Sequence, residues 1–279
     1  MIRKNHLFLL LTWWVVASLA PAQSVSEVSP VQSAARPYNL TIVAPVQIAG
    51  SDAAAAAFQA NVLPGMVTAE SKVLPAFLAH STPNSAIVSL DPSKLVLSAD
   101  AIGRAYFLGE SAGYENSLGI STTDQGPASP GAALIFPNAS NPLGLGGSGK
   151  AIRTSSDPLL PGDFVDLGTL KAGNTLDFFL VAYGATGGTN FVSTNQSLNK
   201  DGLVHAIAMA TPGSPYLVIS FEDQIGGGDR DYNDVFFAVD IGAANVANLL
   251  GLGAPEPSLA LGALMACGVL FGCSRRRMG

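Results

Sequence analysis

Cysteine is nearly absent from this 279-residue sequence. The two cysteines, Cys267 and Cys273, lie near the C-terminus and six residues apart. That spacing is about 9 Å along a helix axis, too far for a disulfide within one helix. The chain before Cys267 therefore has no disulfide available, and its stability must come from a buried core, helped by any ions that it binds.

Basic residues are also few, with 14 Lys and Arg against 20 Asp and Glu. Five of these bases and one acid belong to the terminal segments described below, so nine bases and nineteen acids remain, a net charge of about −10. Nucleic acid binding requires a basic surface, which excludes nucleic acid as a partner and favours metal cations. Only three histidines are present, which argues against a histidine-based zinc site.

The N-terminus has the pattern of a secretory signal peptide. Arg3 and Lys4 precede an apolar run from Leu7 to Leu19, and Ala20-Pro21-Ala22 is a small-x-small cleavage site. We expect signal peptidase to remove residues 1–22. The fold is therefore predicted only from the residues between this segment and the C-terminal segment described next.

The C-terminus combines three features in a fixed order. Pro255-Glu256-Pro257 precedes the apolar run from Ser258 to Gly272, and Arg275-Arg276-Arg277 follows it. As a helix, the segment from Ala254 to Ser274 spans about 30 Å, roughly one hydrocarbon core. The arginines should stay on the cytoplasmic side because moving them through lipid is costly. The sequence thus predicts a transmembrane helix within residues 254–279, with the preceding chain outside the cytoplasm.

This C-terminal segment resembles the PEP-CTERM sorting signal of Gram-negative bacteria. The resemblance implies recognition of the Pro-Glu-Pro motif by an integral-membrane exosortase and removal of the helix during export. It also implies transient inner-membrane anchoring, then location in the cell envelope, at the cell surface or outside the cell, where such proteins act with exopolysaccharide. The alternative is an ordinary membrane anchor that is never cut.

Residues 23–85 read as a leader and N-terminal segment with little regular structure. Tyr38 to Val43 could be a first strand, and Ser51 or Asp52 could cap a short helix over Ala53 to Ala60. Prolines beyond this helix prevent any long one.

From residue 86 to residue 244, short apolar or aromatic runs alternate with clusters of Gly, Pro, Asn and Asp. This pattern predicts an antiparallel β-sandwich, jelly-roll-like, and Gly187-Gly188 predicts a hairpin between its flanking runs. Residues 245–253 read as a linker to the C-terminal segment. The predicted strands are Ala86–Leu90, Ala105–Leu108, Ala132–Phe136, Phe164–Leu167, Leu176–Tyr183, Val204–Met209, Tyr216–Phe221 and Val235–Val239.

The densest chemistry lies between the last two predicted strands. Five carboxylates and one Asn amide occur within thirteen positions, around three successive glycines that tolerate positive φ. Ca²⁺ prefers six to eight oxygen ligands from flexible loops, and these acids would repel one another without a cation. The candidate metal ligands are Glu222, Asp223, Asp229, Asp231, Asn233 and Asp234. The spacing does not fit an EF-hand, because Asp234 stands where that loop needs Gly.

The same segment resembles a bacterial family known as domain of unknown function 4114. Phe221-Glu222-Asp223, a Gly-rich spacer and the run from Asp229 to Asp234 match its pattern. Weaker matches are Asn116-Ser117-Leu118-Gly119 and Asn199-Lys200-Asp201-Gly202 followed by His205. The resemblance covers residues 105–241 and implies an exported or surface protein, without implying an activity.

Three interpretations of the acidic segment remain open. It could bind a divalent cation such as Ca²⁺, it could be a structural loop whose acids cap turns, or two carboxylates such as Glu222 and Asp229 could hydrolyse glycosidic bonds. We expect a non-enzymatic, structural or adhesive protein of the cell envelope or extracellular matrix, with a calcium-binding loop. The alternative is an envelope carbohydrate-active hydrolase that uses these carboxylates.

Overall fold

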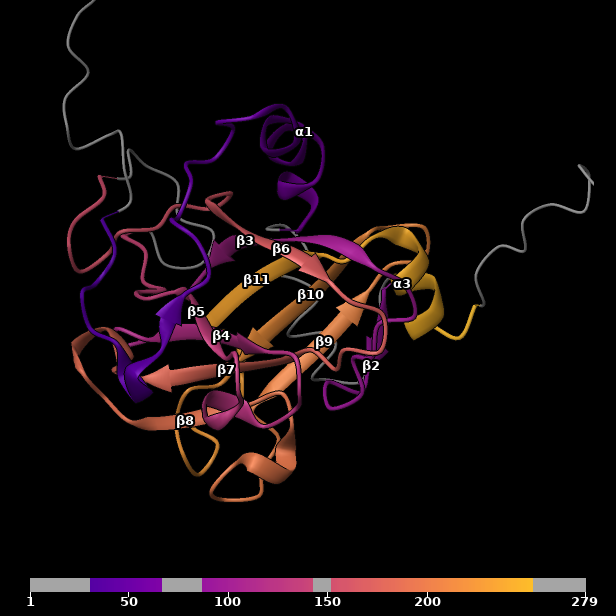
Figure 1. The fold of residues 1–279 in the computed structure, drawn as a ribbon. Coiled ribbons are helices and arrows are strands. Elements are labelled where there is room, and N and C mark those ends of the chain that lie inside the picture. The colour runs from indigo at the N-terminus through magenta and orange to yellow at the C-terminus, as the bar shows by residue number, and fades with distance from the viewer. Residues whose placement is uncertain (1–30, 67–86, 143–151, 253–279) are drawn as a thin grey trace, which may run out of the picture.

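The computed structural model describes residues 31–66, 87–142 and 152–252, which fold mainly into two β-sheets (Figure 1). The order in the five-stranded sheet is β1 (Thr41–Ile42), β5 (Ala133–Phe136), β4 (Ser117–Ser121), β7 (Asp177–Ala182) and β8 (Asn190–Ser193). The order in the six-stranded sheet is β2 (Val88–Leu90), β9 (Ala206–Ala210), β10 (Tyr216–Phe221), β11 (Val235–Asp240), β3 (Ala101–Gly109) and β6 (Phe164–Leu170).

Neighbouring strands are antiparallel in both sheets, except that β1 runs parallel to β5. Within the described residues the helices are short: α1 (Ala53–Asn61), a helical turn at residues 63–66 and α3 (Ala243–Leu249), with 3-10 turns at Pro37–Asn39, Gly126–Ala128, Gly184–Thr186 and Gln196–Leu198. The described chain is thus mainly β, as the sequence predicted.

The main core lies between the two sheets, and the alternation of side chains along β11 shows how it is built. Val235, Phe237 and Val239 point into this core, while Phe236 and Ala238 point to the opposite face of the six-stranded sheet. Successive side chains of a strand face opposite ways, so a strand that is apolar at every position needs cover on both faces. The six-stranded sheet therefore needs a further element on its outer face.

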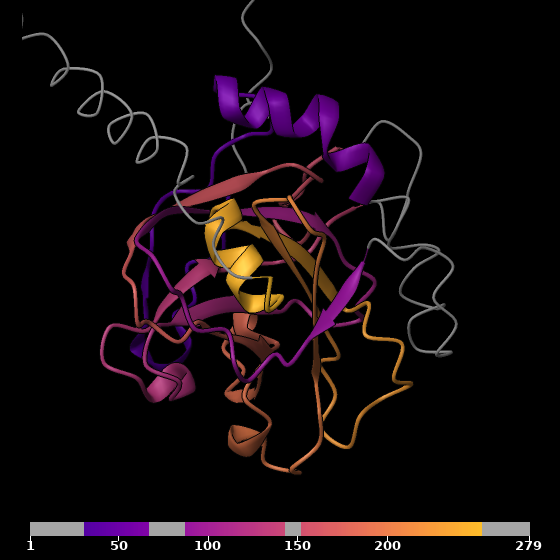
Figure 2. The same ribbon diagram turned by 90° about the vertical axis from the view of Figure 1, so that its right-hand side faces the viewer.

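Helix α1 is that element. Its Phe58 stacks on Tyr106 of β3 with ring centroids 3.8 Å apart, and Figure 2 shows the helix lying along the outside of the sheet. Asp52 caps the helix by accepting a hydrogen bond from the Ala55 N–H at 2.7 Å. The same carboxylate pairs with Arg104 of β3 at 2.9 Å, so cap and sheet are joined. This confirms one of the two predicted caps.

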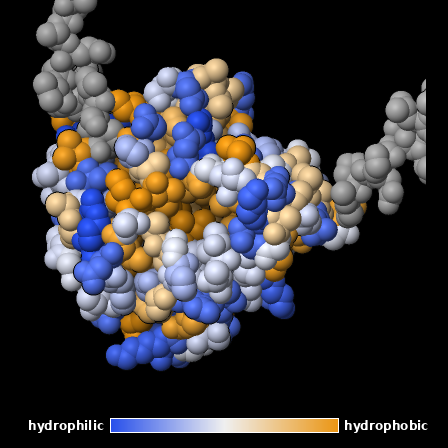
Figure 3. All heavy atoms as spheres, viewed as in Figure 1, coloured by the Kyte–Doolittle hydropathy of each residue, from blue (hydrophilic) through white to orange (hydrophobic). Residues whose placement is uncertain are grey.

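One face of the sandwich has hydrophobic residues at its surface (Figure 3). Figure 3, in the view of Figure 1, shows hydrophobic residues lining a hollow in the middle of this face, where Figure 1 places β5, β6 and β11. Val43, Ala44 and Val46, which follow β1, are partly buried and pack against the main core. The segment around β1 therefore belongs to the folded unit.

Helix α3 occupies residues that the sequence analysis assigned to the end of the sandwich and to a linker. Val246 lies in the main core, and Figure 2 shows the helix across one end of the sandwich. The Asn245 carboxamide accepts from the N–H groups of Ser98 and Ala99 at 2.8 and 2.9 Å and donates to the Ile241 carbonyl at 2.8 Å. These buried contacts fix the segment, so residues 243–249 are part of the fold rather than a linker.

The predicted strands are present, with Ala86 outside the described residues, and the hairpin at Gly187-Gly188 joins β7 to β8. The segment from Tyr38 to Val43 forms a 3-10 turn and a two-residue strand. The sequence analysis missed β4. The predicted signal peptide and the predicted C-terminal sorting segment lie outside the described residues, within which no helix is long and apolar enough to cross a bilayer.

Candidate metal centre

The acidic segment connects two adjacent strands of the six-stranded sheet. Phe221 at the end of β10 pairs with Val235 at the start of β11, so residues 222–234 leave and re-enter the sheet at one point. Hydrogen bonds continue the pairing one step into the loop, from the Asp234 N–H to the Phe221 carbonyl at 3.0 Å. A rigid sheet therefore holds both ends of a glycine-rich loop.

The five carboxylates of this loop fall into two sets that share one residue. Glu222, Asp223 and Asp234 form the first set, and Glu222, Asp229 and Asp231 form the second. Within each set, one oxygen per residue lies within 4.8 Å of the others. Two oxygens that bind one Ca²⁺ at about 2.4 Å can be no farther apart than about 4.8 Å, so each set has the spacing of a cation site.

Gly228 gives Glu222 its position. A Cβ atom at residue 228 would lie 1.8 Å from Glu222 Oε1, and the residue has a φ of +44°. The other oxygen, Oε2, accepts a hydrogen bond from the Arg230 N–H at 3.1 Å. The Glu222 carboxylate therefore lies directly against the loop backbone, which a side chain at position 228 would prevent.

Asn116 approaches the first set from the other sheet, just before β4. Its Nδ2 donates to Asp223 Oδ2 at 2.7 Å, and the Asp223 N–H donates to Asp234 Oδ2 at 2.7 Å. Asn116 is 1% exposed, and its Oδ1 has no hydrogen-bond partner within the described residues. A buried carbonyl oxygen without a partner is costly, and this one is part of the amide that contacts the Asp223 carboxylate.

Burial and mutual repulsion make these carboxylates hard to ionise together. Burial, with the charges of Asp234 and Asp229, raises the pKa of Glu222 to about 8. Burial, with the charge of Asp234, raises the pKa of Asp223 to about 7 against the lowering effect of Asn116. Burial also raises the pKa of Asp231 and Asp234. A cation would relieve this repulsion by stabilising the ionised forms.

The second set lies at the surface of the loop. Asp229 is exposed, and the Asp231 N–H donates to Asp229 Oδ1 at 3.4 Å. The Asn233 N–H and Nδ2 both donate to the Asp231 carboxylate, and the Asn233 carbonyl accepts from the Ser111 N–H at 3.1 Å. The same hydrogen bonds are also expected in an acidic loop that has a purely structural role and binds no cation. Asn233 thus braces Asp231 and ties the loop to the chain after β3.

Glu110, which directly follows β3, carries a buried carboxylate close to this loop. Glu110 accepts hydrogen bonds from the N–H groups of Ala112 at 2.7 Å and Asn141 at 3.0 Å. Burial raises its pKa to about 7, and Asp234 contributes to this rise. Glu110 therefore adds a fifth carboxyl group with a raised pKa to this region.

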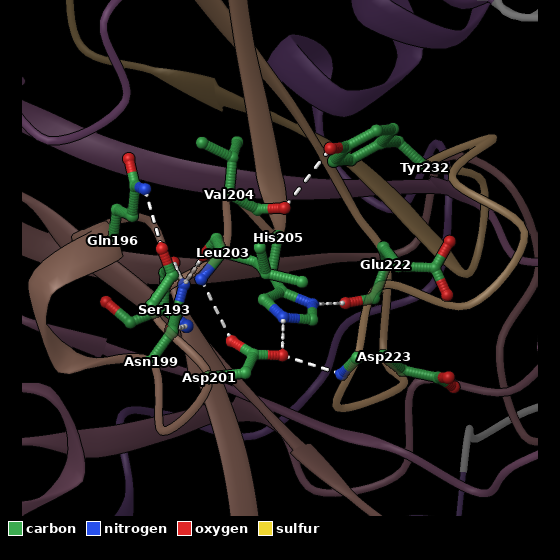
Figure 4. A network of polar contacts seen from close by, with 12 residues as sticks. Ser193, Gln196, Asn199, Asp201, Leu203, Val204, His205, Glu222, Asp223 and Tyr232 are labelled. Atoms are coloured by element: carbon green, nitrogen blue, oxygen red, sulfur yellow. Dashed lines mark hydrogen bonds and ion pairs between the residues drawn. The ribbon is translucent and has the colours of Figure 1, made fainter.

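His205 connects a second loop to the acidic segment (Figure 4). Its Nδ1 contacts the Glu222 carbonyl oxygen at 3.0 Å and its Nε2 contacts Asp201 Oδ2 at 2.9 Å. Asp201 Oδ2 also accepts from the Gly226 N–H at 2.6 Å. The fully buried imidazole thus positions the main chain of Glu222, and the Asp201 carboxylate positions the glycines that follow.

Two tyrosines form an aromatic pair next to this region. The rings of Tyr114 and Tyr183 lie with centroids 4.0 Å apart, and Tyr183 is 48% exposed. Burial, Tyr183 and the nearby charge of Asp223 raise the pKa of Tyr114. An exposed aromatic surface therefore borders the acidic segment.

The structure brings together the candidate ligands that the sequence analysis proposed, but divides their carboxylates into two sets. The sequence analysis did not foresee Asn116 or Glu110 as neighbours of the site. Asn116 was part of the upstream family resemblance, and no local pattern places it beside a residue 107 positions away. Asp201 and His205 were noted for the same resemblance, and the structure gives them a positioning role.

Comparison with known proteins identifies the part of the chain that contains this loop. Residues 170–242 form a DUF4114 domain. The family is described as Domain of unknown function (DUF4114), so the match carries no activity with it. No curated protein and no solved structure matches the chain. The predicted resemblance over residues 105–241 is thus confirmed for the segment that contains β7 to β11 and the acidic loop.

Proposed function

We propose that the loop between β10 and β11 binds Ca²⁺, and that the protein is an exported, non-enzymatic component of the cell envelope or extracellular matrix. The cation stabilises the β-sandwich, which acts structurally or adhesively. Exopolysaccharide is its proposed partner. Signal peptidase and exosortase process the two ends of the chain.

The unpartnered Oδ1 of Asn116 beside the buried Asp223 is the observation that carries the cation proposal. Turn-capping acids that face solvent do not account for a buried carbonyl oxygen without a donor, whereas a cation held beside Asp223 would offer this oxygen a partner. Hard oxygen ligands on a loop with three successive glycines suit Ca²⁺ better than Mg²⁺, which demands near-ideal octahedral geometry.

Export is supported by the sequence of the two ends. The basic and apolar N-terminal run, the Pro255-Glu256-Pro257 motif and the terminal arginines have the order that a sorted envelope protein needs. A fold that uses no disulfide and gains stability from Ca²⁺ suits an environment where this cation is abundant. The exposed Tyr183 beside the loop offers one ring face on which a sugar could stack.

The burial of Glu222 favours a cation over glycoside hydrolysis. Glu222 is only 1% exposed, whereas a general acid must reach the glycosidic oxygen. The hydrolase alternative therefore has less support.

Thermal unfolding of the full-length protein in EDTA and in millimolar Ca²⁺ tests the cation proposal. A ligand that binds only the folded state at a hundred times its Kd adds about 2.7 kcal/mol, which raises Tm by several degrees. Asp234→Asn should remove most of this shift, while Asp166→Asn, on β6 and away from the loop, should keep it. Identical unfolding curves with and without Ca²⁺ would overturn the proposal.

Mass spectrometry of the protein recovered from the producing cells tests the export proposal separately. The expected mature chain begins at Gln23 and lacks the apolar run after Pro257. An intact chain that ends at Gly279 in its final location would instead indicate a permanent anchor.

A further inference from the structure

We infer that the turn between β7 and β8, together with Tyr114, binds a neutral polysaccharide. The turn and the first residue of β8 form residues 183–190, at the edge of the five-stranded sheet (Figure 1). We refer to residues 183–190 and Tyr114 as the tyrosine surface. This inference rests on the proposed exopolysaccharide partner and goes beyond it, because it names the binding residues and the charge class of the polymer.

The main chain of Tyr183 is held in a conformation that a bulky side chain rarely adopts. Its φ is +54° and its ψ is 23°, in the left-handed region where a Cβ atom is crowded and Gly or Asn is favoured. Its carbonyl oxygen accepts hydrogen bonds from the Thr186 N–H at 3.0 Å, the Thr186 Oγ1 at 3.1 Å and the Gly188 N–H at 2.8 Å, which fix this conformation. Gly or Asn at position 183 would suit the fold better, so the aromatic ring is retained against backbone strain. Such strain is typical of positions where the side chain contacts a ligand.

The ring of Tyr183 is exposed and yet firmly placed. Its centroid lies 4.0 Å from that of Tyr114, with 30° between the ring planes, so Tyr114 covers one face, while Tyr183 as a whole is 48% exposed. The segment that carries Tyr114 is tied to the turn, because the Ala185 N–H donates to the Glu115 carbonyl at 3.1 Å. A flat ring held in this way can bind a ligand with little further loss of side-chain entropy.

The groups around this ring are polar but uncharged. Residues 183–190 contain no Asp, Glu, Lys or Arg, and Thr186, Thr189 and Asn190 are exposed. Hydroxyl and carboxamide groups both donate and accept hydrogen bonds, as the hydroxyls of a sugar do. The open ring face can pack against the C–H groups of a pyranose. The tyrosine surface thus combines an apolar platform with a rim that suits a polyhydroxyl ligand.

The charge of the region favours a neutral polymer over an anionic one. The tyrosine surface has no basic residue of its own to pair with a uronate or sulfate group. The acids of the neighbouring loop add negative charge beside it, since burial, Tyr183 and the charges of Asp223 and Asp234 raise the pKa of Tyr114. An anionic polysaccharide would be repelled here, whereas a neutral one would not.

Native affinity electrophoresis of the full-length protein in millimolar Ca²⁺ tests this inference. The gels contain dextran, galactomannan or laminarin as neutral polymers, and carboxymethyl dextran as the anionic comparison. At least one neutral polymer should retard the natural protein, and carboxymethyl dextran should not. Tyr183→Asn should raise the Kd for that polymer at least about tenfold, while Tyr183→Phe, which keeps the ring, should bind like the natural protein. Ile102→Ser removes an exposed apolar side chain of β3 and should leave binding unchanged.

Thermal unfolding of the same variants separates ligand contact from a structural role. Asn accepts the left-handed conformation, which offsets the lost contact with Tyr114, so Tyr183→Asn should change Tm little. A fall in Tm of more than about 5 °C, together with lost retardation, would show that the ring supports the fold and would overturn the inference.

Each other outcome has a defined meaning. Equal retardation of the natural protein and Tyr183→Asn would place the polysaccharide site elsewhere, which overturns the inference and leaves the proposed partner standing. Retardation by carboxymethyl dextran alone would overturn the neutral class and the inference with it. No retardation by any of the four polymers would overturn the inference together with the proposed polysaccharide partner, while the effect of Ca²⁺ on Tm would still decide the cation proposal separately.

Discussion

Raising the pH from 5 to 8 in the presence of EDTA should destabilise the protein, although most surface carboxylates are already ionised over this range. Glu222 and Asp223 have folded-state pKa values of about 8 and 7, against ordinary values of 4.5 and 3.8. Between these limits the folded chain keeps protons that the unfolded chain has released. The stabilisation is complete below about pH 4, falls steadily as the pH rises above that value, and is fully lost once the pH has passed the folded-state values of about 7 and 8.

The expected magnitude follows from linkage. Each group that is protonated only in the folded state lowers the free energy of unfolding by about 1.4 kcal/mol per pH unit. Glu222 and Asp223 repel each other, so their joint slope should lie between one and two such groups, about 1.4 to 2.7 kcal/mol per pH unit. From pH 5 to pH 7 the loss is about 3 to 5 kcal/mol, a large part of the stability of an ordinary domain.

Urea unfolding at half-unit pH steps, followed by far-UV circular dichroism in EDTA, measures this slope. Saturating Ca²⁺ should remove or reverse it, because the cation holds the carboxylates ionised in the folded state. The variant Glu222→Gln, Asp223→Asn should show a smaller slope without Ca²⁺. Glu110, whose pKa is raised to about 7, contributes to what remains, together with Asp231 and Asp234, whose pKa values are also raised. Asp166→Asn should keep the full slope. Stability in EDTA that stays constant or rises from pH 5 to pH 8 would refute this reasoning.

Three further substitutions test particular contacts. Gly228→Ala should weaken Ca²⁺ binding at least about tenfold, because the new Cβ atom displaces the Glu222 carboxylate. Gly226 is also at positive φ but has open space around it, so Gly226→Ala should lower stability only through backbone strain of about 1–2 kcal/mol. Calcium titration measures the first effect and thermal unfolding the second. Asn245→Ala should lower the free energy of unfolding in urea by about 2–4 kcal/mol, because it removes several buried hydrogen bonds. An unchanged urea midpoint would contradict the conclusion that residues 243–249 are part of the fold. Phe237→Ala, at the centre of the main core against Phe178 and Phe221, should cost about 3–5 kcal/mol by the same assay, and a cost under 1 kcal/mol would contradict the packing described for that core.

Alternation of apolar residues and density of turns were enough to predict most of the strands, because both are local properties. They failed at β4, whose sequence Ser-Leu-Gly-Ile-Ser reads as a turn. In the structure Gly119 is a packing residue, since a Cβ atom there would lie 2.3 Å from the Phe179 ring on the neighbouring strand. The requirement for glycine comes from the partner strand and leaves no trace in the local sequence.

The candidate site shows the same limit. The acids of residues 222–234 are close in sequence, and their grouping in one loop was predictable. Asn116 and Glu110 lie more than a hundred positions earlier in the chain. Asn116 reaches the acids through the packing of one sheet on the other, and Glu110 through the pairing of β3 with β11. The division of the carboxylates into two sets was also unpredictable, because it depends on how Gly228 lets the loop fold back on Glu222.

The boundaries of the recognised family segment have a practical consequence for anyone who produces it alone. Residues 170–242 include β7, β9 and β11 but omit β4, β2 and β3, the strands that pair with them. Three interior strands would become open edges with unsatisfied main-chain groups, which invite self-association. A recombinant fragment cut at these limits should precipitate or form oligomers, whereas one that starts before Thr41 and ends after Leu249 keeps every described strand beside its neighbours.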